Sequence, residues 1–271
     1  MSTKCCIIAL GRRVTRLATW PQARAWLGRY VRGLSIGSGT TTLDTWIDTN
    51  SAAIAFGWFI LSIVGYRMLA ERELFESRSI VGAVQKQRVA WMRNMARREN
   101  RVIDGVVLQS LGQGNAFFAS TSAIAIGGLA AIMGSGDKVQ ALLERLPYVA
   151  KSSPESWELK ILLLMAIFIF AFFKFAWAFR LSHYTGIMIG ATPIFHEGNE
   201  VVCDTHAERT ALLIGIAAEH ANSGLRSFYY AIAALAWFFH PWAFVAATTW
   251  VLVILIRRDF FSRSRVILQG G

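Results

Sequence analysis

Four long apolar blocks constrain this chain more than any other feature of its sequence. They cover about residues 51–69, 106–133, 159–181 and 227–256. A helix needs about 20 mainly apolar residues to cross roughly 30 Å of bilayer hydrocarbon, and each block is about that long or longer. Helices also pair their backbone polar groups internally, as the hydrocarbon demands. The sequence therefore predicts an all-α, polytopic membrane protein with four transmembrane helices.

The charged residues support a membrane protein and suggest its partners. They make up 17% of the 271 residues, against roughly 25% in a soluble domain. The formal net charge is +11, and the basic residues flank the apolar blocks, where they orient a protein and contact lipid headgroups. This placement predicts the bilayer and its anionic lipids as partners and argues against nucleic acid.

The N-terminal segment differs from the rest of the chain. Residues 1–43 hold seven basic residues and no acidic one, a composition typical of an organellar transit peptide. A basic arm on the bilayer and an upstream extension of the reading frame are the alternatives. We expect three parts: this extension, a single four-helix membrane domain over 44–265, and a tail over 266–271.

A basic amphipathic helix is predicted between the first two blocks. Eight positive charges there interleave with Trp, Met and Val at broadly helical spacing, which is typical of a helix lying in the membrane interface. A second, shorter surface helix is expected over 139–150. We expect four side chains of the first helix to contact lipid headgroups: Arg93, Arg97, Arg98 and Arg101. A solvated helix packed on the rest of the protein is an equal alternative.

The second block carries a stripe of small residues. It consists of Gly112, Ala116, Ser120, Ala123, Gly127 and Ala131. Small side chains at this spacing let helix backbones approach closely in a membrane. The pattern predicts a buried helix, packed within or between subunits, and suits a homo-oligomer.

The fourth block contains His240 and Pro241 near its middle. Proline removes a backbone hydrogen bond and clashes with the preceding turn, so a kink is expected at Pro241. Thirty residues are too few for two crossings, which predicts one tilted, kinked helix. His240, with Asn115 and Lys174, is a candidate for a transport pathway because ionisable or polar groups are rare at membrane depth. A neutral histidine bonded to a carbonyl freed by the kink is the alternative.

Signals for catalysis or metal binding are weak. His206 and Glu208 offer an imidazole and a carboxylate suited to a metal, but no His-Glu-x-x-His pattern accompanies them. No nucleotide-binding loop and no Cys-x-x-Cys motif is present. We expect no enzyme activity, no cofactor and no metal site.

Three motifs resemble a known family. AFFKFAW at 171–177, ALAWFFHPW at 234–242 and RRDFFSRS at 257–264 are similar to the bacterial integral membrane family called domain of unknown function 599, over about residues 42–265. The resemblance implies a four-span membrane protein and carries no activity or functional residues. It implies a bacterial inner membrane, whereas the acid-free N-terminal segment favours a mitochondrial inner membrane.

The basic segments of the chain do not all favour the same membrane orientation. The eight cations between the first two blocks favour the cytoplasmic or matrix side for that connection. With four crossings, the N-terminal segment and the basic tail then lie on the opposite side, against the positive-inside tendency. The cations of that tail are Arg257, Arg258, Arg263 and Arg265.

Two functions of different classes fit these features. The first is an oligomeric channel or transporter, with its working site between the second and fourth blocks. The alternative is a non-catalytic accessory or scaffold subunit of a larger membrane complex. The first requires Asn115, Lys174 and His240 to line one water-accessible cavity, and the second does not.

Overall fold

A computed structural model describes residues 40–70, 80–135, 139, 153–261 and 263–268. Two compact units divide the chain after residue 50, and of the first unit only the start of a helix is described. The predicted N-terminal extension and the short helix over 139–150 lie almost entirely outside the described residues.

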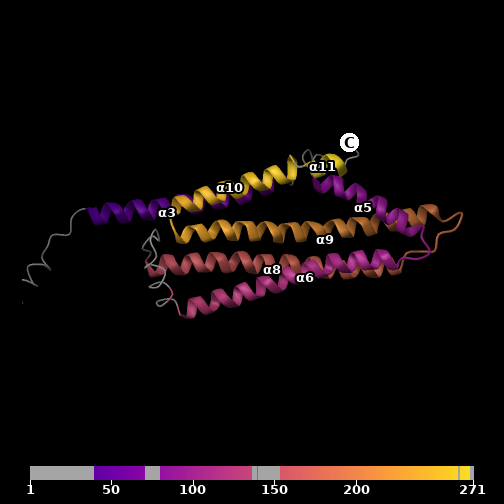
Figure 1. Ribbon diagram of the computed structural model, residues 1–271, viewed down its shortest axis with the longest axis horizontal. Coiled ribbons are helices and arrows are strands. Elements are labelled where there is room, and N and C mark those ends of the chain that lie inside the picture. The colour runs from indigo at the N-terminus through magenta and orange to yellow at the C-terminus, as the bar shows by residue number, and fades with distance from the viewer. Residues whose placement is uncertain (1–39, 71–79, 136–138, 140–152, 262, 269–271) are drawn as a thin grey trace, which may run out of the picture. The chain divides into compact units, whose positions relative to one another are not determined.

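The described residues form helices and no strand, which confirms the all-α fold (Figure 1). In chain order the helices are α3 (Thr40–Ala70), α5 (Ile80–Ala96), α6 (Val102–Gly134), α8 (Pro154–Gly190), α9 (Glu200–Leu235), a 3-10 turn (Ala236–Phe238), α10 (Pro241–Phe260) and α11 (Arg263–Leu268). Within the second unit, aromatic and polar contacts pair α6 with α8, α8 with α9 and α9 with α10, each antiparallel to the next. As a result, α3, α8 and α10 run in one direction and α6 and α9 in the other.

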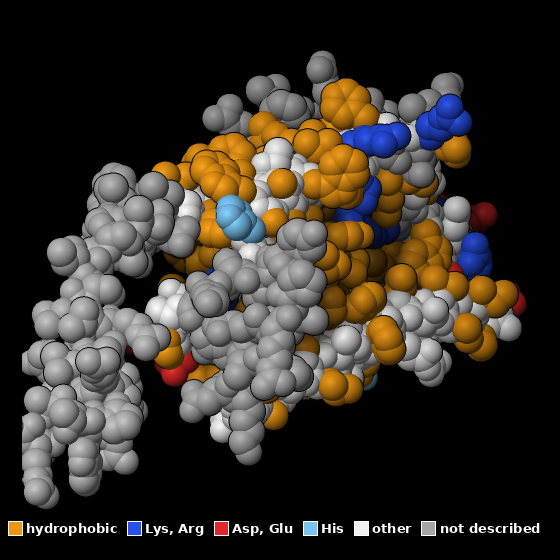
Figure 2. Space-filling model, turned by 60° about the vertical axis from the view of Figure 1, so that its left-hand side comes forward, with side chains coloured by type: hydrophobic (Ala, Val, Ile, Leu, Met, Phe, Trp, Pro, Cys, Tyr) orange, Lys and Arg blue, Asp and Glu red, His pale blue; other side chains and the backbone are white. Residues whose placement is uncertain are grey.

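Among the residues that the structure describes, three helical segments are long and apolar enough to cross a membrane. They are Asn50–Leu69, Val102–Gly134 and Pro154–Gly190. These correspond to the first three predicted spans, whereas the four-span count is not confirmed. Large apolar side chains face outward on these helices, including Leu61, Ile124 and Phe173, as contact with lipid requires. Figure 2 shows hydrophobic side chains over much of the described surface in that view.

The fourth predicted span is not one kinked helix. It is divided between the end of α9 and α10, which fold back on each other. His240 is extended, with φ −159° and ψ 144°, and its Nδ1 accepts a hydrogen bond from the Trp242 amide at 3.2 Å. Pro241 therefore occupies the first turn of α10, where no amide donor is needed and its fixed φ suits a helix. The predicted kink at Pro241 is wrong, because an extended residue before proline ends one helix and the proline begins the next.

Helix α6 lies at an edge of the described structure. It packs chiefly on α8, and only 6% of its most apolar window is buried. Gly112 meets α8, where an added Cβ would lie 3.6 Å from the Cβ of Ser182. The later members of the small-residue stripe, Ser120 and Gly127 among them, are exposed. The prediction of a buried helix is thus wrong within one chain, and packing between subunits stays a prediction.

An aromatic core joins α3, α9 and α10. Phe59 of α3 packs on Phe244 of α10 with ring centroids 5.0 Å apart, and Trp237 stacks on the same ring at 5.1 Å. A Trp58 Nε1 hydrogen bond to Thr249 Oγ1 at 3.1 Å adds a polar link between α3 and α10. This core sets the spacing of α3, α9 and α10, which also line the site described next.

Candidate functional site

A cavity of about 700 Å³ lies among α3, α8, α9 and α10, and Val81 of α5 also lines it. Its lining changes from apolar to polar along the helices. On α8, Leu163 and Phe170 line it first and Lys174 last; on α3, Phe59 lines it first and Arg67 last. At a rise of 1.5 Å per residue, Lys174 lies eleven positions, or about 16 Å, along α8 from Leu163.

Helix α9 lines the same cavity in the opposite order. Its cavity residues run from the polar Glu219 and His220, through Arg226, to Tyr230. Because α9 is antiparallel to α8, its polar residues reach the same end as Lys174. On these three helices the charged lining residues thus lie at one end of the cavity and the more apolar ones at the other. This pattern is expected where a membrane protein meets an interface.

A buried carboxylate organises the charged end. Asp259, only 4% exposed, accepts a hydrogen bond from the Tyr66 hydroxyl. Its oxygens also pair with Arg226 Nη2 at 3.2 Å and Arg258 Nε at 2.9 Å. The Arg226 guanidinium lies over the Tyr66 ring at 5.0 Å. Two cations and a hydroxyl donor compensate the desolvation of this carboxylate.

Lys174 and His220 form the second polar pair of the cavity. Lys174 Nζ lies 3.4 Å from His220 Nδ1 and 5.3 Å from the centre of the Phe170 ring. Burial, and then the charge of Lys174, lower the pKa of His220, which favours a neutral imidazole. Among the described residues, no carboxylate lies within ion-pair distance of Lys174. Lys174 thus brings positive charge to the cavity that no ion pair among the described residues offsets.

Two polar atoms at this site have no hydrogen-bond partner among the described residues. They are the Tyr230 hydroxyl, on a side chain 5% exposed, and Arg226 Nε. An unsatisfied buried polar atom costs about 1–3 kcal/mol. Both belong to cavity-lining residues, so a group entering the cavity could meet them.

The three predicted pathway residues do not share a cavity. Lys174 lines the one described above, as expected from its place in α8. Asn115 is half-buried on α6 and is not among the residues that line it. His240 is exposed at the turn into α10, at the opposite end of that helix from Asp259. In the described structure these three residues therefore do not form the predicted water-accessible pathway.

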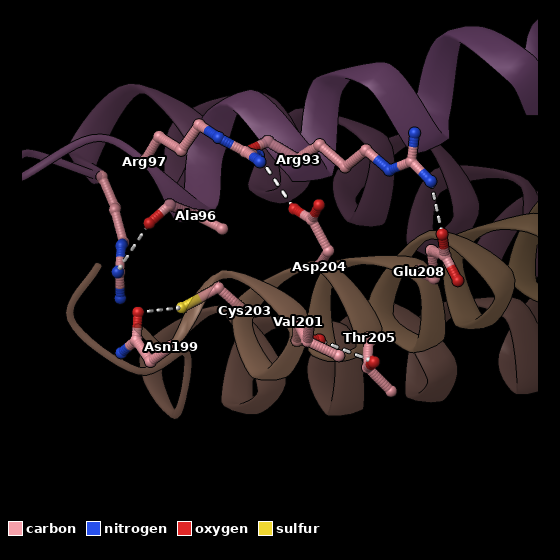
Figure 3. Close-up of polar contacts among 10 residues, drawn as sticks. Arg93, Ala96, Arg97, Asn199, Val201, Cys203, Asp204, Thr205 and Glu208 are labelled. Atoms are coloured by element: carbon pink, nitrogen blue, oxygen red, sulfur yellow. Dashed lines mark hydrogen bonds and ion pairs between the residues drawn. The ribbon is translucent and has the colours of Figure 1, made fainter. Parts of the chain in front are cut away.

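The predicted headgroup arginines make intramolecular contacts instead (Figure 3). Arg93 pairs with Glu208 at 2.5 Å and Arg97 with Asp204 at 2.9 Å, both linking α5 to α9. Arg101 Nη1 donates to the Thr192 carbonyl at 2.7 Å. Of the two interpretations of α5, the helix packed on the rest of the protein agrees with these contacts. We call them the α5 clamp; contact of these arginines with lipid headgroups stays a prediction.

The fourth arginine, Arg98, and the weak metal candidates are also engaged. Arg98 Nη1 pairs with the buried Asp104 at 3.1 Å. His206 Nε2 lies 2.8 Å from the Met188 carbonyl, and Glu208 is held by Arg93. No group of three His, Cys, Asp or Glu side chains close enough for a metal ion occurs among the described residues.

A charge exchange tests the α5 clamp. Asp204→Arg sets two cations against each other and is expected to speed amide hydrogen exchange in α5, at a cost of about 0.5–1 kcal/mol for this partly exposed pair. Combining it with Arg97→Asp restores opposite charges and should recover most of the protection. Unchanged exchange in the single variant would show that this ion pair does not hold α5.

Most of the site could not be found from the sequence. Tyr66, Arg226 and Asp259 come from three helices and are separated by up to 193 positions. One signal was available: Asp259 is the only acidic residue between 220 and the end of the chain, and it lies among arginines. An acid in such a setting indicates an ion-pair network at a helix end.

The part of the chain that forms the cavity matches a family model. No curated protein and no solved structure matches the chain. The model of a family described as "Protein of unknown function, DUF599" matches residues 54–264, a range that contains every residue lining the cavity. The match confirms the resemblance of the three motifs, and this chain belongs to the DUF599 family of proteins of unknown function.

Proposed function

We propose that the protein is a carrier for an amphiphilic small molecule, which it binds in the cavity among α3, α8, α9 and α10. The observation that carries this proposal is the change of the lining from Phe59 to Arg67 on α3 and from Leu163 to Lys174 on α8, with the charged residues of α9 at the same end as Lys174. An amphiphile has the same change along its length, and its apolar part would replace lipid contacts at little cost. The volume lies within the range of small-molecule sites.

A carrier fits the geometry better than an ion channel. A channel needs polar groups along a continuous path, and Asn115 and His240 lie away from the cavity. The accessory-subunit role is the second candidate, because α6 exposes small residues such as Ser120 and Gly127 that could admit another helix closely. Neither role requires catalysis.

Filling the apolar end of the cavity tests the carrier. Ala166 lines this end, and Ala166→Trp is expected to weaken binding of a fluorescent fatty-acyl probe at least about tenfold, because the indole occupies the volume of the chain. Purified protein in nanodiscs of zwitterionic lipid, titrated with the probe, provides the measurement.

The matched control adds the same side chain elsewhere in the membrane region. Ala123→Trp lies on the exposed face of α6, away from the cavity, and should bind the probe as the natural protein does. Movement of the probe between leaflets of proteoliposomes, lost in Ala166→Trp alone, would support transport. Probe binding that is the same in both variants would count against the carrier.

A further inference from the structure

We infer that the amphiphile is an anion, with a carboxylate or phosphate headgroup at Lys174 and Arg226 and a single acyl chain toward Leu163. This inference rests on the proposed carrier and names its ligand class. The positive charge available at the polar end of the cavity, an unpaired donor there and the length of the cavity each support it.

The charges at the polar end favour a negative headgroup. Arg67, Lys174 and Arg226 line the cavity with two carboxylates, Glu219 and Asp259. Arg258 pairs with Asp259 as well, so that carboxylate is already shared by two arginines and has little attraction left for a cationic ligand. Lys174 has no carboxylate partner among the described residues, and it is the charge that an anion would meet.

An unpaired donor favours oxygen acceptors. Arg226 Nε can only donate a hydrogen bond, and it is buried without a partner in the part of the chain that the structure describes. A carboxylate or phosphate offers several acceptor oxygens and forms charge-assisted hydrogen bonds with a guanidinium. A hydroxyl headgroup offers one such oxygen, and a trimethylammonium headgroup none. The other unpaired donor, the Tyr230 hydroxyl, belongs to a ring that packs on Phe59 toward the apolar end.

The apolar part limits the ligand to one chain. From Lys174 back to Leu163 the lining on α8 is apolar over about 16 Å, and Phe59, Ile63 and Ile167 complete it. A volume of about 700 Å³ accommodates a single-chain amphiphile with its headgroup. A second acyl chain would have to remain outside, in the bilayer.

Four amphiphiles that share a twelve-carbon chain and differ in headgroup separate the contribution of the headgroup to binding affinity from that of the chain. They carry a carboxylate, a phosphate, a hydroxyl or a trimethylammonium group, and each displaces the fluorescent acyl probe from protein in zwitterionic nanodiscs. We expect both anions to bind about tenfold or more tightly than the alcohol, as a charge-assisted hydrogen bond allows, and the cation to bind most weakly. Inorganic phosphate is expected not to displace the probe.

One substitution tests the assigned charge. Lys174→Gln should remove most of the ratio between anion and alcohol affinity. Lys86→Gln, on an exposed position of α5, is the matched control and should keep that ratio.

The outcomes separate the inference from the proposed function. Equal affinity for all four headgroups, or a preference unchanged by Lys174→Gln, would overturn the anionic ligand and leave the carrier standing. Displacement by inorganic phosphate alone would replace the amphiphile with a free anion. If no chain-bearing compound displaced the probe from the natural protein, the carrier itself would fail.

Discussion

Asp259→Ala is expected to be among the most destabilising single substitutions in this protein, at a cost of about 3 kcal/mol. Removing one member of a buried ion pair leaves the other charge uncompensated, which typically costs 3–5 kcal/mol. Arg226 and Arg258 are partly exposed, which argues for the lower end of that range. The Tyr66 hydroxyl would also lose its acceptor, so the packing of α3 on α10 should weaken together with the ion pairs.

Thermal unfolding in detergent or nanodiscs, followed by tryptophan fluorescence, measures this loss. Asp204→Ala removes a carboxylate from a partly exposed pair and should cost less than about 1 kcal/mol. Asp259→Asn keeps the side-chain volume and one acceptor oxygen, so its loss of stability should fall between those of the two alanine variants. Equal stability of the Asp259→Ala and Asp204→Ala variants would contradict the structural role of the cluster.

Gly224→Leu is expected to separate α8 from α9 and to prevent stable folding at physiological temperature. A Cβ on Gly224 would lie 2.6 Å from Phe175 Cε2, and the Phe175 ring is itself almost fully buried. Even Gly224→Ala should therefore cost about 1–3 kcal/mol through overpacking, less the roughly 1 kcal/mol that alanine gains over glycine in a helix.

A second glycine gives the matched control. Gly127 has nothing within 4 Å of an added Cβ, so Gly127→Ala should be neutral or stabilising by up to about 1 kcal/mol. Phe175→Leu combined with Gly224→Ala should recover part of the loss, because the smaller side chain vacates the clash. Gly224→Ala as stable as Gly127→Ala would show that α8 and α9 do not approach closely at this position.

The same glycine shows why the sequence misleads about α9. Glycine often follows a helix end, and Gly224 stands just before the fourth apolar block. In the structure, α9 continues through it to Leu235, because the missing side chain makes room for Phe175. The thirty-residue block therefore is not a helix by itself: its first part completes a helix that begins at Glu200. A glycine that ends a helix and one that admits a neighbouring ring look alike in a single sequence.

The apolar blocks were the reliable part of the sequence. Block length fixed the helices α6 and α8 and the membrane part of α3, because hydrocarbon thickness sets that length directly. Lys174 stands out in the sequence as a cation inside an apolar block, and the structure places it in the cavity lining. The partners of Asp259 could not be predicted, because the contact between α3 and α10 depends on tertiary packing that no local pattern records.

The reversal of chain direction at His240 bears on the number of membrane crossings. If both arms of the α9–α10 hairpin cross the membrane, the number of crossings becomes odd, and the C-terminal arginines return to the side of α5. A Gln87 Nε2 hydrogen bond to the Leu268 carbonyl at 3.2 Å already joins α5 to α11. The positive-inside tendency then favours the same side for both basic segments and predicts that side to be cytoplasm or matrix. The charged mouth of the cavity would open toward the inner leaflet, where anionic lipids collect.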